Sequence, residues 1–133
     1  MDTKLERKLP WALLLLRLGI FIVMFVWALD KFVNPAHTAA VFEGFYGIAG
    51  LSSLAATVLG SLQVALCLVF LAGFWKTYSY GLVMVLHGVS TLSSFGAYLD
   101  AFNNLLFFAA WPMFAACIAL FMLREYDTKL AVS

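Results

Sequence analysis

The sequence predicts an all-α fold, a four-transmembrane-helix up-and-down bundle, and three observations predict it. The chain of 133 residues is 65% hydrophobic and only 11% charged, well above the roughly 45 to 50% apolar share of soluble domains. Four separate segments are mainly apolar and have the length of about 20 residues that a helix needs to cross a bilayer. The last two connections between them are short, which makes successive helices antiparallel neighbours. We expect one integral membrane domain over residues 1–133.

The first predicted span, residues 11–29, carries an arginine inside its apolar run. Arg17 lies about six residues after the start of the span, roughly 9 Å into the bilayer at the rise of an α-helix. A charge at this depth is costly and usually faces protein or water, and snorkelling to the headgroups is the alternative. The other spans have no acidic residue at this depth. We therefore expect the counter-ion of Arg17 to be a ligand, a lipid or another subunit.

The loop after this span is predicted to contain a short interfacial helix. Asn34 followed by Pro35 is the favoured start of a helix. Four apolar residues then share one helix face, and they are Ala39, Phe42, Phe45 and Tyr46. Such a helix lies on the membrane surface or folds back on the mouth of the bundle. Glycines at positions 44, 47 and 50 are predicted to end it, and Ser52 or Ser53 starts the second span.

The remaining spans are predicted at residues 53–75, 78–98 and 104–123. The third carries a polar stripe spaced four and three residues apart, formed by Tyr80, Met84, His87, Thr91, Ser94 and Tyr98. This spacing places the stripe on one helix face. Because lipid is a poor neighbour for polar groups, we expect that face to point into the bundle. Pro112 removes a backbone donor from the fourth span and predicts a kink there.

Basic residues near the span ends predict the orientation. One side carries Lys4, Arg7, Lys8, Lys76, Arg124 and Lys129, against Lys31 alone on the other. The positive-inside rule then places both termini in the cytoplasm. The N-terminus has features of a signal peptide, but its apolar run is longer than a usual signal core and contains Arg17, so we expect no cleavage. A net charge of +1 gives no reason to expect a nucleic-acid partner.

Six residues are candidates for binding a ligand or partner, namely Arg17, Lys31, Gln63, Tyr80, His87 and Thr91. His87 lies near mid-membrane, where an imidazole can exchange a hydrogen bond or relay a proton, and a buried histidine satisfied by its neighbours is the alternative. Cys67 and Cys117 fall in one layer, either as a redox pair or as small apolar fillers. Because the sequence has no phosphate loop, Ser-His-Asp arrangement or zinc-type cluster, we assign no metal site and no catalytic residue.

Spans one to three resemble the DoxX family of small four-helix bacterial membrane proteins. The first helix of that family carries an arginine near its start and a lysine near its end, which Arg17 and Lys31 match. Asn34-Pro35 and the hydrophobic external helix follow, and Gly73-Phe74-Trp75-Lys76 is similar to the glycine-then-basic hairpin of the family. The chain departs from the family at Ala28, where glycine is usual, at Gln63, where an acid is frequent, and in lacking a glycine-rich ending of the fourth helix.

The resemblance implies a multi-pass protein of the bacterial plasma (inner) membrane. Our leading hypothesis is an accessory or scaffold subunit that binds a lipid, a quinone or a protein partner, or that forms a homo-oligomer. The alternative is the membrane subunit of a quinone-linked oxidoreductase, with His87 near the quinone oxygen, although the missing carboxylate at Gln63 weakens proton-coupled catalysis. A small-solute or metal transporter is a third hypothesis, and it would need to oligomerise because the chain lacks paired repeats.

Overall fold

The computed structural model describes residues 2–132, and all of its regular elements within that range are helical. The α-helices are α1 (Thr3–Val33), α2 (Pro35–Tyr46), α3 (Ser53–Leu71), α4 (Lys76–Ser93), α5 (Phe95–Leu99) and α6 (Ala110–Met122). Short 3-10 helices occur at η1 (Ala101–Asn103), η2 (Leu105–Ala109) and η3 (Arg124–Tyr126). The predicted all-α class is therefore confirmed.

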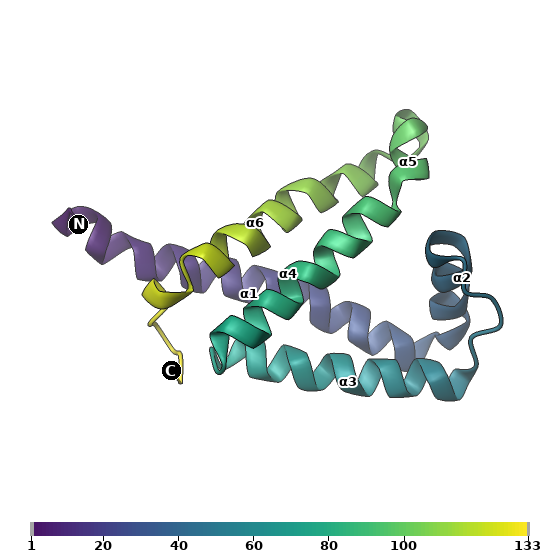
Figure 1. Cartoon of the computed structure of the whole chain (residues 1–133), viewed down its shortest axis with the longest axis horizontal. Helices are drawn as coiled ribbons and strands as arrows, with labels where there is room; N and C mark the ends of the chain where they lie inside the picture. Colours follow the sequence, from purple (N-terminus) through teal and green to yellow (C-terminus); the bar gives the residue numbers. More distant parts are fainter. Residues whose placement is uncertain (1, 133) are drawn as a thin grey trace.

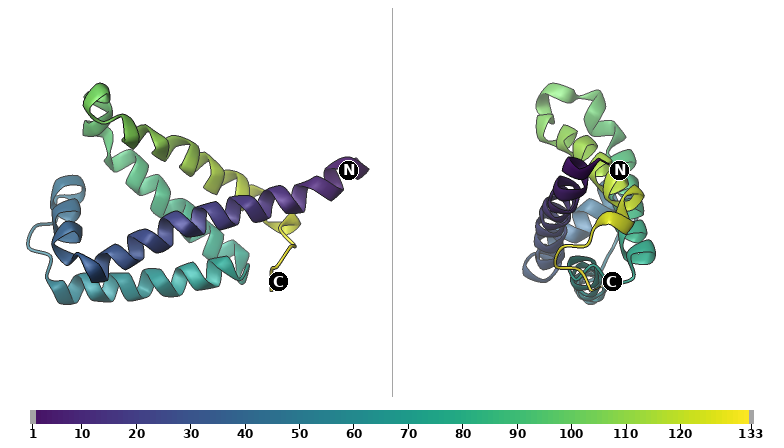
Figure 2. Two further views of the ribbon diagram at one scale, coloured as in Figure 1. Left: turned by 180° about the vertical axis from the view of Figure 1, so that it is seen from behind. Right: turned by 90° about the vertical axis from the view of Figure 1, so that its left-hand side faces the viewer.

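The long helices pack as two pairs (Figure 1). One pair is α1 with α3, and the other is α4 with α6. The pairs come together near the α3–α4 hairpin and the C-terminal segment, and they diverge toward the opposite end, where α2 and α5 lie (Figure 2). The two helix pairs are therefore in closest contact at the end of the bundle where the C-terminal segment lies.

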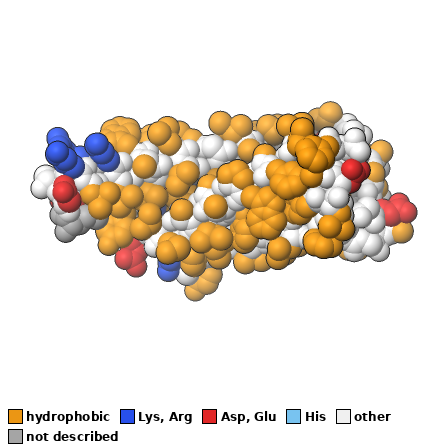
Figure 3. Space-filling model, turned by 90° about the horizontal axis from the view of Figure 1, so that it is seen from above, with side chains coloured by type: hydrophobic (Ala, Val, Ile, Leu, Met, Phe, Trp, Pro, Cys, Tyr) orange, Lys and Arg blue, Asp and Glu red, His pale blue; other side chains and the backbone are white. Residues whose placement is uncertain are grey.

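A single apolar core joins all four long helices. Its buried members are Leu13, Ile20, Met24, Cys67, Phe70, Tyr80, Val83, Cys117 and Leu120. The two cysteines are free thiols inside this core, as apolar fillers would be. Figure 3 shows apolar side chains along the outer surface and charged side chains gathered toward the two ends.

Three helical segments within the described residues are long and apolar enough to cross a membrane, namely α1, α3 and residues 105–122. This composition is that of a membrane protein. Helix α4 has 18 residues, but the polar residues it carries keep it out of that set. On the polar stripe Tyr80, Thr91 and Ser94 are buried. The stripe therefore faces the bundle interior.

The termini of α2 and α3 follow the predicted positions with two differences. Asn34 precedes α2 and Pro35 is its first residue, but the Asn34 side chain makes no capping hydrogen bond. Gly47, with φ of 70°, ends the helix, whereas Gly44 lies inside it and does not terminate it. Ser52 caps α3 as predicted, since its Oγ accepts from Ala55 N at 3.1 Å.

The predicted third span is interrupted after α4, and the fourth begins as a 3-10 helix that continues directly into α6. Helix α4 ends at Ser93, and α5, η1 and η2 fill the stretch that was expected to be the end of one continuous helix and the start of the next. Pro112 is the third residue of α6, directly after η2, so its missing N–H falls in the first α-helical turn, and the kink predicted there stays a prediction. The N–H groups of a first helical turn have no acceptor within the helix, and proline is tolerated there.

Candidate functional site

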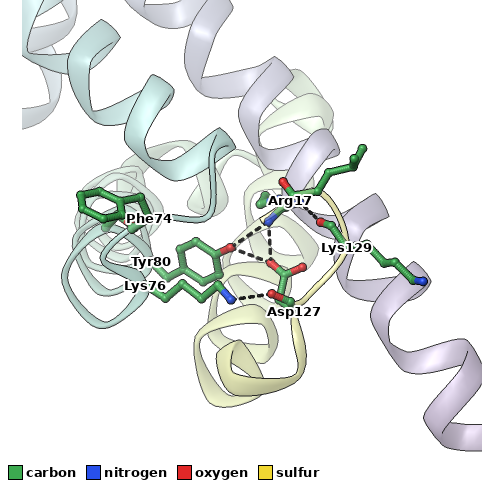
Figure 4. Close-up of polar contacts among 8 residues, drawn as sticks. Arg17, Phe74, Lys76, Tyr80, Asp127 and Lys129 are labelled. Atoms are coloured by element: carbon green, nitrogen blue, oxygen red, sulfur yellow. Dashed lines mark hydrogen bonds and ion pairs between the residues drawn. The ribbon is translucent and has the colours of Figure 1, made fainter. Parts of the chain in front are cut away.

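The most elaborate polar site surrounds Arg17, whose side chain is fully buried on α1. Its Nη1 atom lies 3.4 Å from Oδ2 of Asp127, which is also fully buried and follows η3 near the end of the chain (Figure 4). Removing two charges from water is costly unless they are paired and hydrogen-bonded. The two residues therefore compensate each other across 110 positions of sequence.

Tyr80 on α4 completes the link between the helix pairs. Its hydroxyl donates to Asp127 Oδ2 at 2.6 Å and accepts from Arg17 Nη1 at 3.4 Å. The Tyr80 ring packs against Phe70 of α3, with ring centroids 5.0 Å apart. The carboxylate is thus held by one side chain from each helix pair.

The residues after η3 form a C-terminal strap, defined here as residues 127–132. Arg17 Nη2 donates to the backbone carbonyls of Lys129 and Leu130, the latter at 3.1 Å. Lys76 Nζ donates to the carbonyl of Asp127 at 2.5 Å, and Val132 N donates to the carbonyl of Ala72 at 2.8 Å. The strap is held by its backbone and by one carboxylate (Figure 4).

Gly73 in the α3–α4 hairpin leaves room for this arrangement. Its φ is +66°, a region in which L-residues are strained. A Cβ at this position would lie 2.6 Å from Arg17 Nη1 and 2.7 Å from Ala131 Cβ. The hairpin therefore needs glycine for its backbone and for the close approach of both the guanidinium and the strap.

Two basic side chains lie next to Asp127, which carries a single negative charge. Arg17 lies against its carboxylate, and the ammonium group of Lys76 lies against its carbonyl. Burial lowers the pKa of Lys76, the charge of Asp127 partly offsets this, and Arg17 adds to the lowering. Lys76 therefore holds its proton less tightly than an exposed lysine does.

Two buried polar atoms of the site are incompletely satisfied. Within residues 2–132, Arg17 Nε and Asp127 Oδ1 have no hydrogen-bond partner. Most buried polar groups in proteins are paired. One unused donor and one unused acceptor are what a water molecule or a polar ligand atom would use.

Asp127 corrects the sequence-based expectation that Arg17 is neutralised by a ligand, a lipid or another subunit. That expectation considered depth within the predicted spans only, and Asp127 comes after the fourth span. The chain folds back at η3 and brings the carboxylate to the level of Arg17. No pattern in the sequence links Asp127 to Arg17, because Asp127 lies in an irregular segment after the fourth predicted span.

The other predicted site residues are scattered rather than assembled around Arg17 and Tyr80. Gln63 Nε2 donates to the carbonyl of Met24 at 3.3 Å, and Lys31 Nζ donates to the carbonyl of Trp27 at 3.4 Å. These two bonds tie side chains of the α1–α3 pair to the backbone of α1.

His87 and Thr91 form a separate contact on α4. Thr91 donates its hydroxyl to the carbonyl of His87 at 2.6 Å. The ring atom Nε2 of His87 is buried and has no partner in the described part of the chain. Its neighbours thus leave the imidazole partly unsatisfied.

At the opposite end of the bundle the contacts are fewer. Oδ2 of Asp30 lies 2.6 Å from Nδ1 of His37, whose ring stacks on Trp27 at a centroid distance of 5.6 Å. Phe45 of α2 meets Phe107 of η2, with ring centroids 5.8 Å apart. These contacts attach α2 to α1 and bridge the two helix pairs.

Two surface hollows lie near the α3–α4 hairpin. An apolar one of about 250 Å³ is lined by Ala65, Leu66, Val69, Trp75, Tyr78, Ser79 and Leu82. A polar one of about 380 Å³ is lined by Lys76, Thr77, Arg124, Glu125 and Thr128. The described residues contain no group of three or more His, Cys, Asp or Glu side chains placed to hold a metal ion.

Comparison of the chain with known protein families, curated proteins and solved structures finds no match. The geometry alone therefore defines what the site can do. Arg17, Lys76 and Tyr80 together offer donors to a carboxylate and to backbone carbonyls of the strap.

Proposed function

We propose that the chain is a DoxX-like integral protein of the bacterial plasma membrane that acts as an accessory or scaffold subunit. One observation carries the proposal: the most elaborate polar site, around Arg17, is occupied by the chain's own C-terminal strap. A site filled in this way holds helices together and presents no nucleophile or general base to a substrate. Binding a partner fits these contacts better than independent catalysis.

The proposed topology has four spans with both termini in the cytoplasm. Helix α4 serves as the third span, because its 18 residues extend roughly 27 Å and its polar face is covered by the bundle. Helix α2 then lies at the outer membrane surface. The strap and the α3–α4 hairpin, which carry Lys76, Arg124 and Lys129, lie at the cytoplasmic boundary in accord with the positive-inside rule.

A protein partner is the ligand we favour among lipid, quinone and protein. The strap occupies the Arg17 site as a peptide, through backbone carbonyls and one side chain. The same donors would receive a segment of another subunit. The N-terminal turns of α1, with exposed Lys4, Arg7 and Lys8, add a charged surface on the same side of the membrane.

The test is mass spectrometry of the tagged protein extracted together with its native lipids. We expect a protein subunit to be recovered with the wild type and to be depleted in the Arg17→Leu variant, because the strap site loses its main donor. The Asp100→Asn variant, altered far from the site, serves as the control. Unchanged recovery of partner and lipid in Arg17→Leu at unchanged expression would contradict the role given to Arg17.

The alternative is a membrane subunit of a quinone-linked oxidoreductase, and the unpartnered Nε2 atom of His87 is what favours it. An imidazole buried in this way can hydrogen-bond a quinone oxygen. The discriminating measurement is the quinone content of the purified protein and of a His87→Leu variant. Quinone present in the wild type and lost in the variant supports the alternative, and its absence from both speaks against it.

A further inference from the structure

We propose that the C-terminal strap is an exchangeable peptide ligand, and that the residues holding it bind an acidic peptide segment of a partner protein in its place. This inference rests on the proposed role as an accessory subunit and gives the partner a chemistry. The holding residues are Arg17, Ala72, Gly73, Lys76 and Tyr80, called here the strap receptor.

Most of the hydrogen bonds that hold the strap are made to its backbone, so binding depends on few of its side chains. Beyond Asp127, the receptor contacts its backbone: Arg17 donates to two carbonyls and Ala72 accepts from one amide. Of the side chains that follow, Leu130 is 83% exposed and Val132 is 71% exposed, whereas Ala131 packs against Gly73 and the Lys129 ammonium lies over the Trp11 ring. Recognition therefore depends on one carboxylate, on main-chain carbonyls and on a small side chain opposite Gly73, which an acidic peptide segment can offer.

The receptor is built by the bundle rather than by the strap. Tyr80 is positioned by its packing on Phe70, and the Gly73 amide donates to the carbonyl of Phe70 at 3.0 Å. Arg17 belongs to a helix that packs against both α3 and α6. These contacts persist when the strap is replaced.

Because Arg17 is buried, replacing the strap by another acidic segment is more favourable than releasing the strap without a replacement. If the strap left without a substitute, Arg17 would remain as an uncompensated buried charge, which is strongly unfavourable. An incoming carboxylate removes this cost because it takes the place of Asp127. The occupant must consequently be acidic.

The strap is also an imperfect occupant. Leu130 has a φ of +49°, a left-handed conformation that costs energy for a residue other than glycine. Within the described chain, Arg17 Nε and Asp127 Oδ1 lack hydrogen-bond partners. A segment without this backbone strain, or one that uses the spare donor, can compete even though the strap is tethered and has a high effective concentration.

The test uses the full-length protein in lipid nanodiscs and a fluorescent peptide with the sequence REYDTKLAVS of residues 124–133. In the Asp127→Asn variant the tethered strap loses its carboxylate, but the receptor is intact. We expect this variant to bind the peptide with one-to-one stoichiometry and at least about tenfold tighter than the wild type, whose strap competes. A peptide with asparagine in place of aspartate should not bind, and Asp100→Asn protein should behave as wild type.

A measurement on the wild type keeps the proposal testable if Asp127→Asn does not fold. The Val132 amide, which donates to Ala72, reports strap docking through its hydrogen exchange. Saturating REYDTKLAVS peptide should accelerate that exchange, and the peptide with asparagine in place of aspartate should leave it unchanged. The proposal that the strap is exchangeable is overturned if the exchange is unchanged under saturating REYDTKLAVS peptide, or if wild type and Asp127→Asn bind the peptide equally. If a partner subunit is nevertheless recovered with the wild type, the accessory role stands and only this inference fails.

Discussion

The two ends of the bundle are held together by opposite kinds of contact. At the strap end, buried charges and backbone hydrogen bonds join α1, the α3–α4 hairpin, α4 and the C-terminal strap. At the α2 end, the bridge between the helix pairs is the aromatic contact of Phe45 with Phe107, and a partly exposed pair of Asp30 with His37 attaches α2 to α1. The helix pairs converge at the first end and diverge at the second.

This difference indicates which end of the bundle determines how the long helices pack. A buried ion pair is strongly unfavourable to break, whereas a solvent-exposed pair contributes little. In an apolar environment, hydrophobic contacts do not select one helix neighbour over another as directional hydrogen bonds do. We infer that the strap end fixes the arrangement of the four long helices and that the α2 end tolerates change.

The largest effect is expected when one member of the buried pair is removed. Asp127→Ala leaves Arg17 buried without its carboxylate, and such a loss costs about 3 to 5 kcal/mol. Reversible unfolding in mixed micelles, followed by circular dichroism, measures the change in the free energy of unfolding. The double variant Arg17→Met with Asp127→Leu should recover most of the loss because no unpaired charge remains. A single variant as stable as wild type would refute the buried-pair account.

Gly73 at the strap end and Gly47 at the α2 end have similar backbone conformations. Comparing their alanine variants distinguishes the cost of backbone strain from the cost of a steric clash. Gly73 and Gly47 have φ of +66° and +70°. A Cβ at Gly47 meets no atom within 4 Å, whereas one at Gly73 meets Arg17 at 2.6 Å. Gly47→Ala should therefore cost only the left-handed strain of about 1 to 2 kcal/mol. Gly73→Ala should cost more and should also raise the hydrogen exchange of the Val132 amide. Equal losses for the two variants would contradict the close approach.

Lys76 gives the strap end a pH dependence. Burial holds its pKa below the ordinary value of 10.5, so the unfolded chain binds this proton more tightly than the folded chain. Stability then rises with pH between the lowered pKa and 10.5, and the contribution is constant above that window. The free energy of unfolding of wild type, relative to Lys76→Met, should increase from neutral pH to pH 10.5. A difference that stays flat or decreases would show that Lys76 is not desolvated.

The sequence predicts a structural feature well when that feature depends on residues that are close together in the chain. The end of α2 at Gly47 and the cap at Ser52 follow from residues within one helical turn, and they are where they were expected. The inward face of α4 follows from its spacing. The end of α4 at Ser93 and the 3-10 start of the fourth span do not, because hydropathy measures apolar character and not helical continuity.

For a related reason, the sequence predicts the residues that α1 and α4 contribute to the candidate site but not those that the strap contributes. A charge inside an apolar run identifies Arg17, and the polar stripe identifies Tyr80, from helix geometry alone. Asp127 and the carbonyls of the strap are contributed by a segment with no periodicity, and they meet Arg17 only through the return of the chain after α6. Long-range pairing between an irregular segment and a helix leaves no pattern in a single sequence.

The smallest effect is expected at the α2 end, from the pair of Asp30 with His37. Their contact of 2.6 Å is short, but the His37 side chain is 43% exposed, and exposed pairs contribute about 0 to 1 kcal/mol. Asp30→Asn should change the free energy of unfolding by no more than this, and it leaves the stacking of His37 on Trp27 in place. The same micelle unfolding assay, run beside Asp127→Asn as the matched change at the strap end, makes the comparison direct. If Asp30→Asn were as damaging as Asp127→Asn, the two ends would be equally specified, and burial would not be what distinguishes them.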